Sequence, residues 1–265
     1  MPVSGRLAGK AAIVTGAGSS GPGLGTGRAM AVLFAREGAR VVLVDMFQDR
    51  AQETLDMIEK EGGEATIVVA DLSDLSQAQR IVDDAVTRYD GVDILVNNAA
   101  ISSSTNLLDT SIELLQRILT VNLAAPFMLI KAVVPVMQRG GGGSIVNISS
   151  IAALRGQGGQ GQTAYASAKA GLEGLMYDVA DAFGKDGIRI NCVAPGIIDT
   201  PMRNNAITQA GLDPAQLDLT YKISLPSEGD AWDIAQTALF LVSPEGHYIT
   251  GVMIPVDGGT IARSH

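Results

Sequence analysis

Tyr165 and Lys169 are the side chains of this sequence best suited to acid–base chemistry. They stand four positions apart in a segment with helical periodicity, so both emerge on one face within a single turn. An ammonium beside a phenol stabilises the phenolate and lowers the pKa of the tyrosine from about 10 toward the range of a general acid or base. The same spacing is common in ordinary surface pairs, so the pair alone leaves both interpretations open.

A serine hydroxyl is expected near this pair. Ser149 and Ser150 follow directly after an apolar run at residues 144–148 that is typical of a strand. The end of a parallel strand delivers side chains to the carboxyl edge of a sheet, where ligands bind. A serine at this edge can hydrogen-bond a substrate oxygen, which favours a catalytic function for Tyr165 and Lys169.

A glycine-rich turn could bind phosphate. Residues 16–27 hold six glycines in twelve positions, directly after an apolar run and at the start of a helical segment. Glycines let backbone amides approach a pyrophosphate, and a helix start supplies free N–H donors with partial positive charge. A flexible structural loop is the alternative, but the strand before and the helix after favour a dinucleotide.

Two acidic residues follow the next two apolar runs. A carboxylate at Asp45 can accept both hydroxyls of an adenosine ribose and would repel a 2′-phosphate, which favours NAD over NADP. Asp71 is similarly placed to meet the adenine amino group. Each could instead cap the helix that follows it.

These side chains need a sheet to position them, and the hydrophobic pattern predicts one. Short runs rich in Val and Ile alternate with segments of helical periodicity, which predicts an α/β fold: a doubly wound (Rossmann), seven-stranded parallel sheet with helices on both faces. The expected strands are residues 11–15, 40–44, 66–69, 94–97, 144–148, 188–193 and 252–254. The expected helices are residues 28–37, 48–61, 73–89, 111–138, 164–183 and 230–241, with Gly38, Gly62 and Gly91 ending the first three.

No linker or repeat divides the chain, so a single domain over residues 1–265 is expected. Residues 200–226 differ from the rest, because their periodicity is weak and they follow directly after a strand end. We expect them to form a substrate lid, with a plain surface excursion as the alternative.

Composition excludes several classes of function. A net charge of −9 repels nucleic acid and anionic lipid over most of the surface. One cysteine, Cys192, and two histidines provide no metal-ligand spacing and no internal disulfide, which favours a small buried thiol and a reducing, cytoplasmic setting. No signal peptide or membrane span is expected, since the longest apolar stretch, residues 123–137, is interrupted by Lys131 and two prolines.

Taken in order along nearly the whole chain, the motifs resemble those of the short-chain dehydrogenase/reductase family. They are Thr15-Gly16 with Gly25-Thr26-Gly27, Asp45, Asp71, Asn97-Asn98-Ala99-Ala100, Val121-Asn122, Ser149-Ser150, Tyr165 with Lys169, Pro195-Gly196 with Ile198 and Thr200, and Asp257-Gly258-Gly259. Each motif is weak by itself, but together and in this order they are specific.

The resemblance implies a role for each matching residue. Tyr165 would exchange the proton of the alcohol oxygen while hydride moves between its carbon and the nicotinamide. Lys169 would lower the tyrosine pKa and bind the nicotinamide ribose, Ser150 would orient the substrate oxygen, and Asn122 would hold a water that connects Lys169 to solvent. The implied cofactor-binding residues are Gly16, Ser20, Gly25, Thr26, Gly27, Asp45, Asp71, Leu72, Asn98, Ala99, Ala100, Tyr165, Lys169, Pro195, Gly196, Ile198 and Thr200.

The sequence departs from the family pattern in two places. The glycine turn is about five residues longer than the usual TGxxxGxG, so which of Ser19, Ser20 and Gly21 meets phosphate stays open. The spacing from Ser150 to Tyr165 is also longer than usual. Ser150 is chosen as the second serine after the strand, and Ser149 is the alternative.

The resemblance and Asp45 together predict an NAD-dependent alcohol dehydrogenase or carbonyl reductase acting on a secondary alcohol and its ketone. One alternative is a 3-oxoacyl-thioester reductase, a branch that often prefers NADPH. Another is a nucleotide-binding sensor or scaffold that has lost catalysis. The family commonly forms tetramers through its long helices, so a homotetramer is expected.

Overall fold

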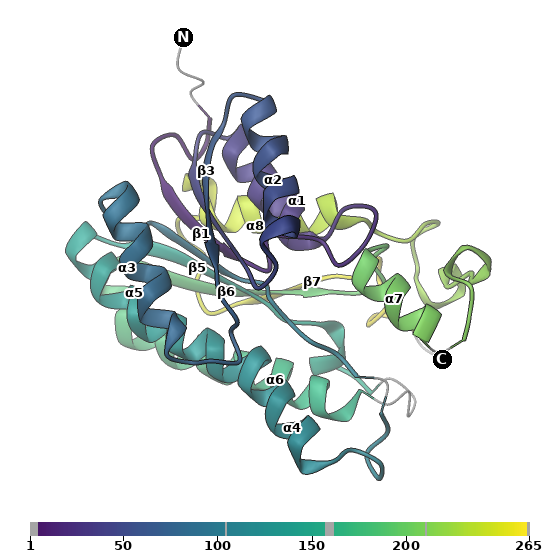
Figure 1. The fold of residues 1–265 in the computed structure, drawn as a ribbon. Helices are drawn as coiled ribbons and strands as arrows, with labels where there is room; N and C mark the ends of the chain where they lie inside the picture. Colours follow the sequence, from purple (N-terminus) through teal and green to yellow (C-terminus); the bar gives the residue numbers. More distant parts are fainter. Residues whose placement is uncertain (1–4, 104, 157–161, 210, 264–265) are drawn as a thin grey trace.

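The protein forms one parallel sheet covered by helices on both faces (Figure 1). The computed structural model describes residues 5–103, 105–156, 162–209 and 211–263. The strands are β1 (Ala11–Thr15), β2 (Arg40–Asp45), β3 (Glu64–Val69), β4 (Ile94–Asn97), β5 (Gly143–Ile148), β6 (Ile188–Pro195) and β7 (Met253–Val256). The helices are α1 (Thr26–Arg36), α2 (Gln48–Lys60), α3 (Gln77–Tyr89), α4 (Ile112–Leu119), α5 (Ala125–Gly140), α6 (Thr163–Phe183), α7 (Pro201–Gln209) and α8 (Ala231–Val242).

Strand order explains where ligands can enter. The sheet runs β3-β2-β1-β4-β5-β6-β7 with every pair parallel, which is the doubly wound order predicted from the sequence. The chain builds outward from β1 to β3 and then returns to β4 on the other side of β1. Helices therefore leave β1 and β4 toward opposite faces, and this switch opens a crevice at the carboxyl edge of the sheet.

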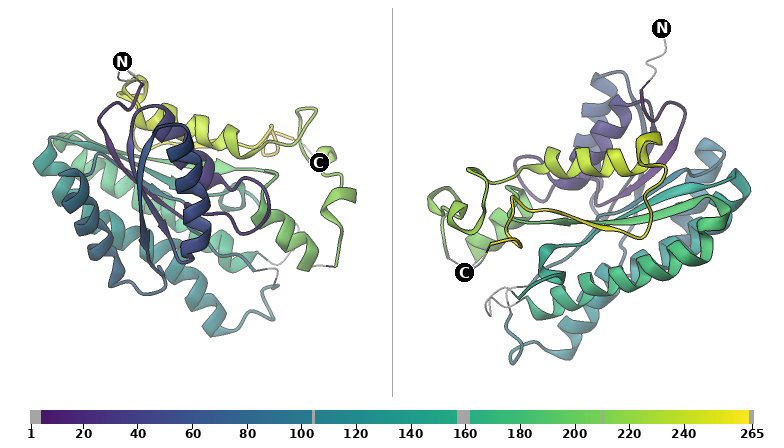
Figure 2. Two further views of the ribbon diagram at one scale, coloured as in Figure 1. Left: turned by 45° about the horizontal axis from the view of Figure 1, so that its top comes forward. Right: turned by 180° about the vertical axis from the view of Figure 1, so that it is seen from behind.

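The alternation of side chains along each strand supplies the two halves of the core. Val14 and Leu43 pack with α1, α2 and α8 on one face, whereas Ile13 and Val42 pack with α3, α5 and α6 on the other. The two layers of helices are visible from both sides in Figure 2. Because both faces are covered, the central strands are apolar at almost every position.

The segment predicted as one helix over residues 111–138 is two helices joined by a π-helical turn, Thr120–Ala124. The amide of Ala125 donates to the carbonyl of Thr120, five residues back, which widens the helix by one residue. Pro126, which follows at once, has no amide hydrogen with which to restore the tighter pattern. The widened turn holds Asn122 inside the fold.

Both the start of α3 and the residue that ends it differ from the sequence prediction. Helix α3 starts at Gln77 rather than at residue 73, because the carboxylates of Asp71 and Asp74 accept the amides of Ser73 and Ser76 and hold this stretch in turns. At the other end of α3 the left-handed residue is Asp90, with φ of 61°, rather than Gly91.

The helical stretch Ile112–Gly140 is long and apolar enough to cross a membrane, contrary to the expectation from the sequence, and it is the one such stretch in the described part of the chain. Its apolar side chains have another use, however. Leu129, Val133 and Met137 are fully buried against the sheet. The apolarity of the stretch is therefore explained by core packing.

Candidate active site

A cavity of about 780 Å³ opens at the carboxyl edge of the sheet. It runs from Asp71 beside β3 to the lid and to the first turn of α6. All the predicted cofactor-binding residues line this cavity, and so do Ser150, Tyr165 and Lys169. Side chains as far apart in the chain as Ser20 and Thr200 therefore share one space of the size typical of ligand sites.

The first two turns of α6 carry the proposed acid–base pair. Helical spacing places the Lys169 Nζ atom 5.7 Å from the centroid of the Tyr165 ring, over its face. The same ammonium donates a hydrogen bond of 2.6 Å to the carbonyl of Ile148 at the end of β5. Lysine and tyrosine are thus held together where the strand carrying the serines ends.

The two serines have different tasks. The Ser149 hydroxyl is buried and donates to the Lys169 carbonyl at 3.1 Å, which ties β5 to α6. The Ser150 hydroxyl accepts from the Ala152 amide at 3.1 Å and also hydrogen-bonds the Tyr165 side chain. Ser150 is therefore the serine that can share a substrate oxygen with Tyr165, as the family pattern places it.

Burial controls the protonation of both groups. Removal from water raises the pKa of Tyr165 to about 12, and the Ser150 hydrogen bond opposes this only in part. Burial also lowers the pKa of Lys169 to about 8. The expectation that the ammonium acidifies the phenol is not met in this structure, because Lys169 faces the ring and donates to Ile148 rather than to the phenolic oxygen.

Asn122 lies behind the cavity rather than in its wall. Its carboxamide is fully buried, accepts the amide of Ile101 at 2.9 Å and donates to the carbonyl of the same residue at 2.8 Å. The side chain is thus committed to the loop after β4, a contact that the sequence did not predict. If Asn122 binds a water for Lys169, it does so through its main-chain atoms, and this role stays a prediction.

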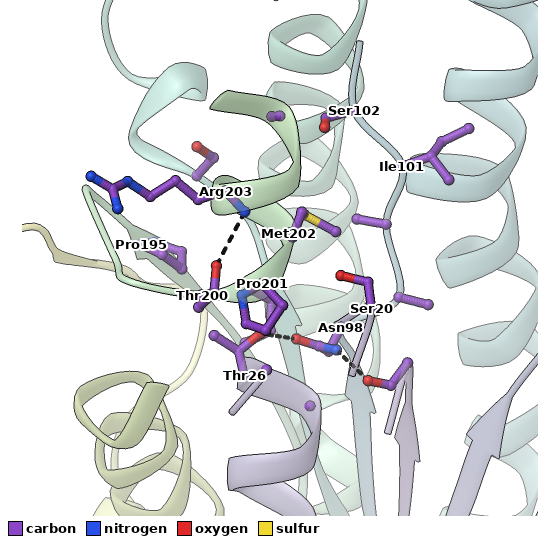
Figure 3. Close-up of a pocket in the computed structure, with 18 of the residues that line it drawn as sticks. Ser20, Thr26, Asn98, Ile101, Ser102, Pro195, Thr200, Pro201, Met202 and Arg203 are labelled. Atoms are coloured by element: carbon purple, nitrogen blue, oxygen red, sulfur yellow. Dashed lines mark hydrogen bonds between the residues drawn. The ribbon is translucent and has the colours of Figure 1, made fainter. Parts of the chain in front are cut away.

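The glycine turn is built for close backbone packing. A Cβ at Gly27 would lie 2.0 Å from the Gly16 carbonyl oxygen, and Gly16 itself has a φ of 63°, which favours glycine. Thr26 donates to Asn98 at 2.7 Å (Figure 3). Asn98 in turn donates to the Thr15 carbonyl at 2.9 Å. These side chains brace the turn against β4.

The start of α1 suits a phosphate. Its N-cap is Gly25, which offers no side-chain oxygen to the first amides, and its first turn has no acidic residue. Gly25, Thr26 and Gly27 all line the cavity. The open amides and the helix dipole therefore favour an anion at this end of the helix.

Asp45 both braces the turn and faces the cavity. One carboxylate oxygen accepts the Gly18 amide at 2.9 Å, and the other accepts the Phe47 amide at 3.0 Å. A carboxylate has about four acceptor positions, so capacity for ribose hydroxyls remains. Next to it, the Arg50 guanidinium lies 4.0 Å from the centre of the Phe47 ring, and both residues line the cavity.

The lid contains a helix that the sequence pattern did not reveal. Helix α7 lines the cavity through Met202 and Ile207, and the side-chain amide of Asn205 donates to the carbonyl of Ser20 at 3.1 Å. The Thr200 hydroxyl accepts the Arg203 amide at the start of α7 (Figure 3). The Arg203 guanidinium in turn pairs with Glu228 at 2.9 Å. The enlarged glycine turn and the lid are therefore in direct contact.

Several residues of the cavity wall were missed by sequence reasoning. Arg117 and Val121 reach it from α4 and the π-helical turn, Ile101 from the loop after β4, and Lys222 from the end of the lid. Arg117, Ile101 and Lys222 belong to no motif, and Val121 belongs to the Val121-Asn122 motif but had no role assigned to it. Of these residues, only Val121 could have been predicted to lie in the cavity wall, because it is next to Asn122 in the sequence.

Comparisons with known proteins agree with this geometry. The family model for enoyl-(acyl carrier protein) reductases matches residues 22–260. An uncharacterized short-chain type dehydrogenase/reductase, y4mP of Sinorhizobium fredii, is 38% identical over 96% of this chain and 98% of its own. The 3-oxoacyl-[acyl-carrier-protein] reductase FabG of Thermotoga maritima is 37% identical over 97% and 99%. The crystal structure of carveol dehydrogenase from Mycobacterium avium in complex with NAD has a TM-score of 0.90 and 30% identity, covering 98% of this chain and 100% of that one.

Proposed function

The chain belongs to the short-chain dehydrogenase/reductase family of oxidoreductases, and from this premise we propose that it interconverts a secondary alcohol and its ketone with NAD(H). One observation carries the proposal: Ser150, Tyr165 and Lys169 line the same cavity as the glycine turn and Asp45. Support for an alicyclic alcohol comes from the similarity to carveol dehydrogenase.

The residues present fit a nicotinamide dinucleotide. The open start of α1 would hold the pyrophosphate, Asp45 the adenosine ribose, and the turn at Asp71 and Leu72 the adenine. The opposite end of the dinucleotide would lie against Pro195, Gly196, Ile198 and Thr200 at the end of β6 and the start of the lid. When bound, NAD supplies the hydride acceptor.

Proton transfer falls to the chain itself. With its pKa raised to about 12, Tyr165 is a neutral phenol at physiological pH and can donate its proton to the oxygen of a ketone. Ser150 would fix that oxygen through its hydroxyl. In the direction of alcohol oxidation Tyr165 must first lose its proton, and the Lys169 ammonium would have to turn from the Ile148 carbonyl toward the phenolic oxygen to stabilise the phenolate.

Replacing Tyr165 by Phe tests the proposal. The variant should lose about 10²–10⁴-fold in kcat for a cyclic alcohol, because the ring is kept and only the proton donor is removed. NADH affinity, measured by fluorescence titration, should remain close to that of the native protein. A variant that keeps most of its turnover would refute the assignment.

Cofactor choice is tested at Asp45. Asp45→Ala should weaken NAD binding and relieve the repulsion of the 2′-phosphate, so the ratio of kcat/KM for NAD over NADP should fall about tenfold or more. Native kinetics that favour NADP would refute the assignment of NAD.

A second candidate is a 3-oxoacyl-thioester reductase that uses NADPH. Two observations favour it: the similarity to FabG, and the Arg50 guanidinium at the adenosine end of the cavity, where it could meet a 2′-phosphate. Assays of NADPH oxidation with acetoacetyl-CoA against NADH oxidation with cyclic ketones separate the two.

We also propose that the protein is a homotetramer assembled through its long helices. Phe127 on α5 and Tyr177 on α6 are about half exposed, so both long helices have aromatic side chains that a second copy would cover in such an assembly. Light scattering with size-exclusion chromatography tests the stoichiometry, and a monomeric mass would refute it.

A further inference from the structure

The part of the cavity away from the adenosine end, which we call the substrate half, has an unusual balance of charge. It is lined by α4, by the start of α6 and by residues 202–222 of the lid. Most of its lid side chains are apolar, among them Met202, Ile207 and Leu212. Its charged side chains, apart from the paired Arg203 and from Lys169 beside Tyr165, are Arg117 and Lys222, and both are cationic.

No carboxylate balances these cations. Asp45 and Asp71 are the acidic residues that line the cavity in the described part of the chain, and both lie at its adenosine end. The residues outside the described ranges include no Asp or Glu. The acids of the lid, Asp213 and Asp218, accept amides of their own loops and do not line the cavity.

Neither cation is paired elsewhere. Among the described residues Arg117 makes no ion pair, and Glu113, one turn earlier, is hydrogen-bonded at the helix start with Ser111. Lys222 lies over the ring of Tyr221, 5.6 Å from its centroid, and likewise has no carboxylate within ion-pair distance. In a chain of net charge −9, two cations facing one cavity without an acid create a local positive potential that attracts anions.

The dinucleotide does not account for these cations. Its phosphates would be held at the start of α1, whereas Arg117 comes from α4 and Lys222 from the far end of the lid. These are the elements that would surround a substrate lying against Tyr165. We therefore assign Arg117 and Lys222 to substrate binding rather than to cofactor binding.

We infer that the substrate is an oxo or hydroxy compound with an apolar body and an anionic group. Arg117 and Lys222 would bind the anion, and the apolar lid residues would cover the body while the reacting oxygen meets Tyr165. The inference rests on the proposed function, because it assigns Tyr165 to that oxygen. The anion could be a carboxylate of the substrate itself or the phosphates of a thioester carrier.

Paired ketones test the inference. NADH oxidation is measured with 4-oxocyclohexanecarboxylate and with its neutral methyl ester, which share one ring. A second pair is acetoacetyl-CoA and the phosphate-free N-acetylcysteamine thioester of acetoacetate. In the native protein kcat/KM should favour the anionic member of one pair by about tenfold or more, and the pair that shows the preference identifies the source of the anion.

Variants assign the preference to the two side chains. Arg117→Gln and Lys222→Gln should each reduce the ratio of kcat/KM for the anionic over the neutral ketone by at least about threefold. The double variant should abolish the preference, and KM for NADH should stay unchanged in all three variants. Arg139→Gln and Lys131→Gln, which remove exposed cations of α5 outside the cavity, are the matched controls and should leave it intact. Equal kcat/KM for both members of both pairs would overturn the inference while leaving the proposed function in place.

A binding measurement covers the case in which no ketone is turned over. Calorimetric titration of the NADH-loaded protein with cyclohexanecarboxylate and with cyclohexylmethanol should show tighter binding of the carboxylate, lost in the double variant. Preferential binding without turnover of any ketone would refute the proposed function but retain the anion site. Equal binding of the two ligands would overturn the site as well.

Discussion

We predict that Lys169 destabilises the fold at neutral pH, because its ammonium is buried. Its side chain is 2% exposed, and burial lowers its pKa from 10.5 to about 8. At 1.36 kcal/mol for each pKa unit, a buried ammonium costs the native state about 3 kcal/mol when both folded and unfolded chains are protonated. In Lys169→Met this cost disappears, but the Ile148 carbonyl loses its donor, which costs about 1–3 kcal/mol.

The sign of the pH dependence follows from proton counts. Between pH 8 and 10.5 the unfolded chain binds a proton at Lys169 that the folded protein has already released. Stability therefore rises with pH across this window in the native protein, and the variant lacks the rise. At pH 7 Lys169→Met should be as stable as the native protein or up to about 2 kcal/mol more stable, and by about pH 9.5 the difference should have moved by about 2 kcal/mol in favour of the native protein.

Urea unfolding of both proteins at the two pH values measures this difference. Cys192 and Tyr165, whose pKa values burial raises to about 12, stay protonated in both folded proteins over this range. Lys131→Met, at an exposed position of α5, is the control and should show no such movement. The reasoning fails if Lys169→Met is destabilised by more than about 2 kcal/mol at pH 7 by an amount that does not change with pH.

Three further substitutions probe the framework of the site. Gly27→Ala should cost about 2–3 kcal/mol in urea unfolding and abolish dinucleotide binding, because its Cβ would lie 2.0 Å from a carbonyl oxygen of the glycine turn. Asn122→Ala should cost about 2–3 kcal/mol and reduce kcat/KM, since both hydrogen bonds to Ile101 are lost. Asn205→Ala, at a lid contact with the glycine turn, should raise the Kd for NADH about three- to tenfold without changing stability by more than about 0.5 kcal/mol. An unchanged free energy of unfolding in the first two variants, or an unchanged Kd in the third, would contradict these contacts.

The local hydrophobic pattern was enough to predict the sheet and most of its helices, but not the π-helical turn or helix α7. Strand β1 is apolar at every position except Thr15 at its end, so its burial on both faces could be predicted from its residues alone. The π-helical turn could not be, because Asn122 occupies a helical pattern and its contact with Ile101, in the loop after β4, exists only in the folded chain. Helix α7 was missed for a related reason: its residues have no amphipathic period, and it is held at its start by the contact of Thr200 with Arg203 and in its middle by Asn205.

The sequence by itself determined the order of the elements, the parallel sheet and the residue types that meet at its carboxyl edge, because hydrophobic period and glycine placement are local properties of the chain. The tertiary structure decided what those residues do there. Only burial shows that Tyr165 is held neutral and Lys169 is made less basic, and only packing shows that Ser149 is structural while Ser150 faces the cavity. A pKa and a hydrogen-bond partner depend on everything packed around a group, including segments distant in the sequence, and no local pattern contains that information.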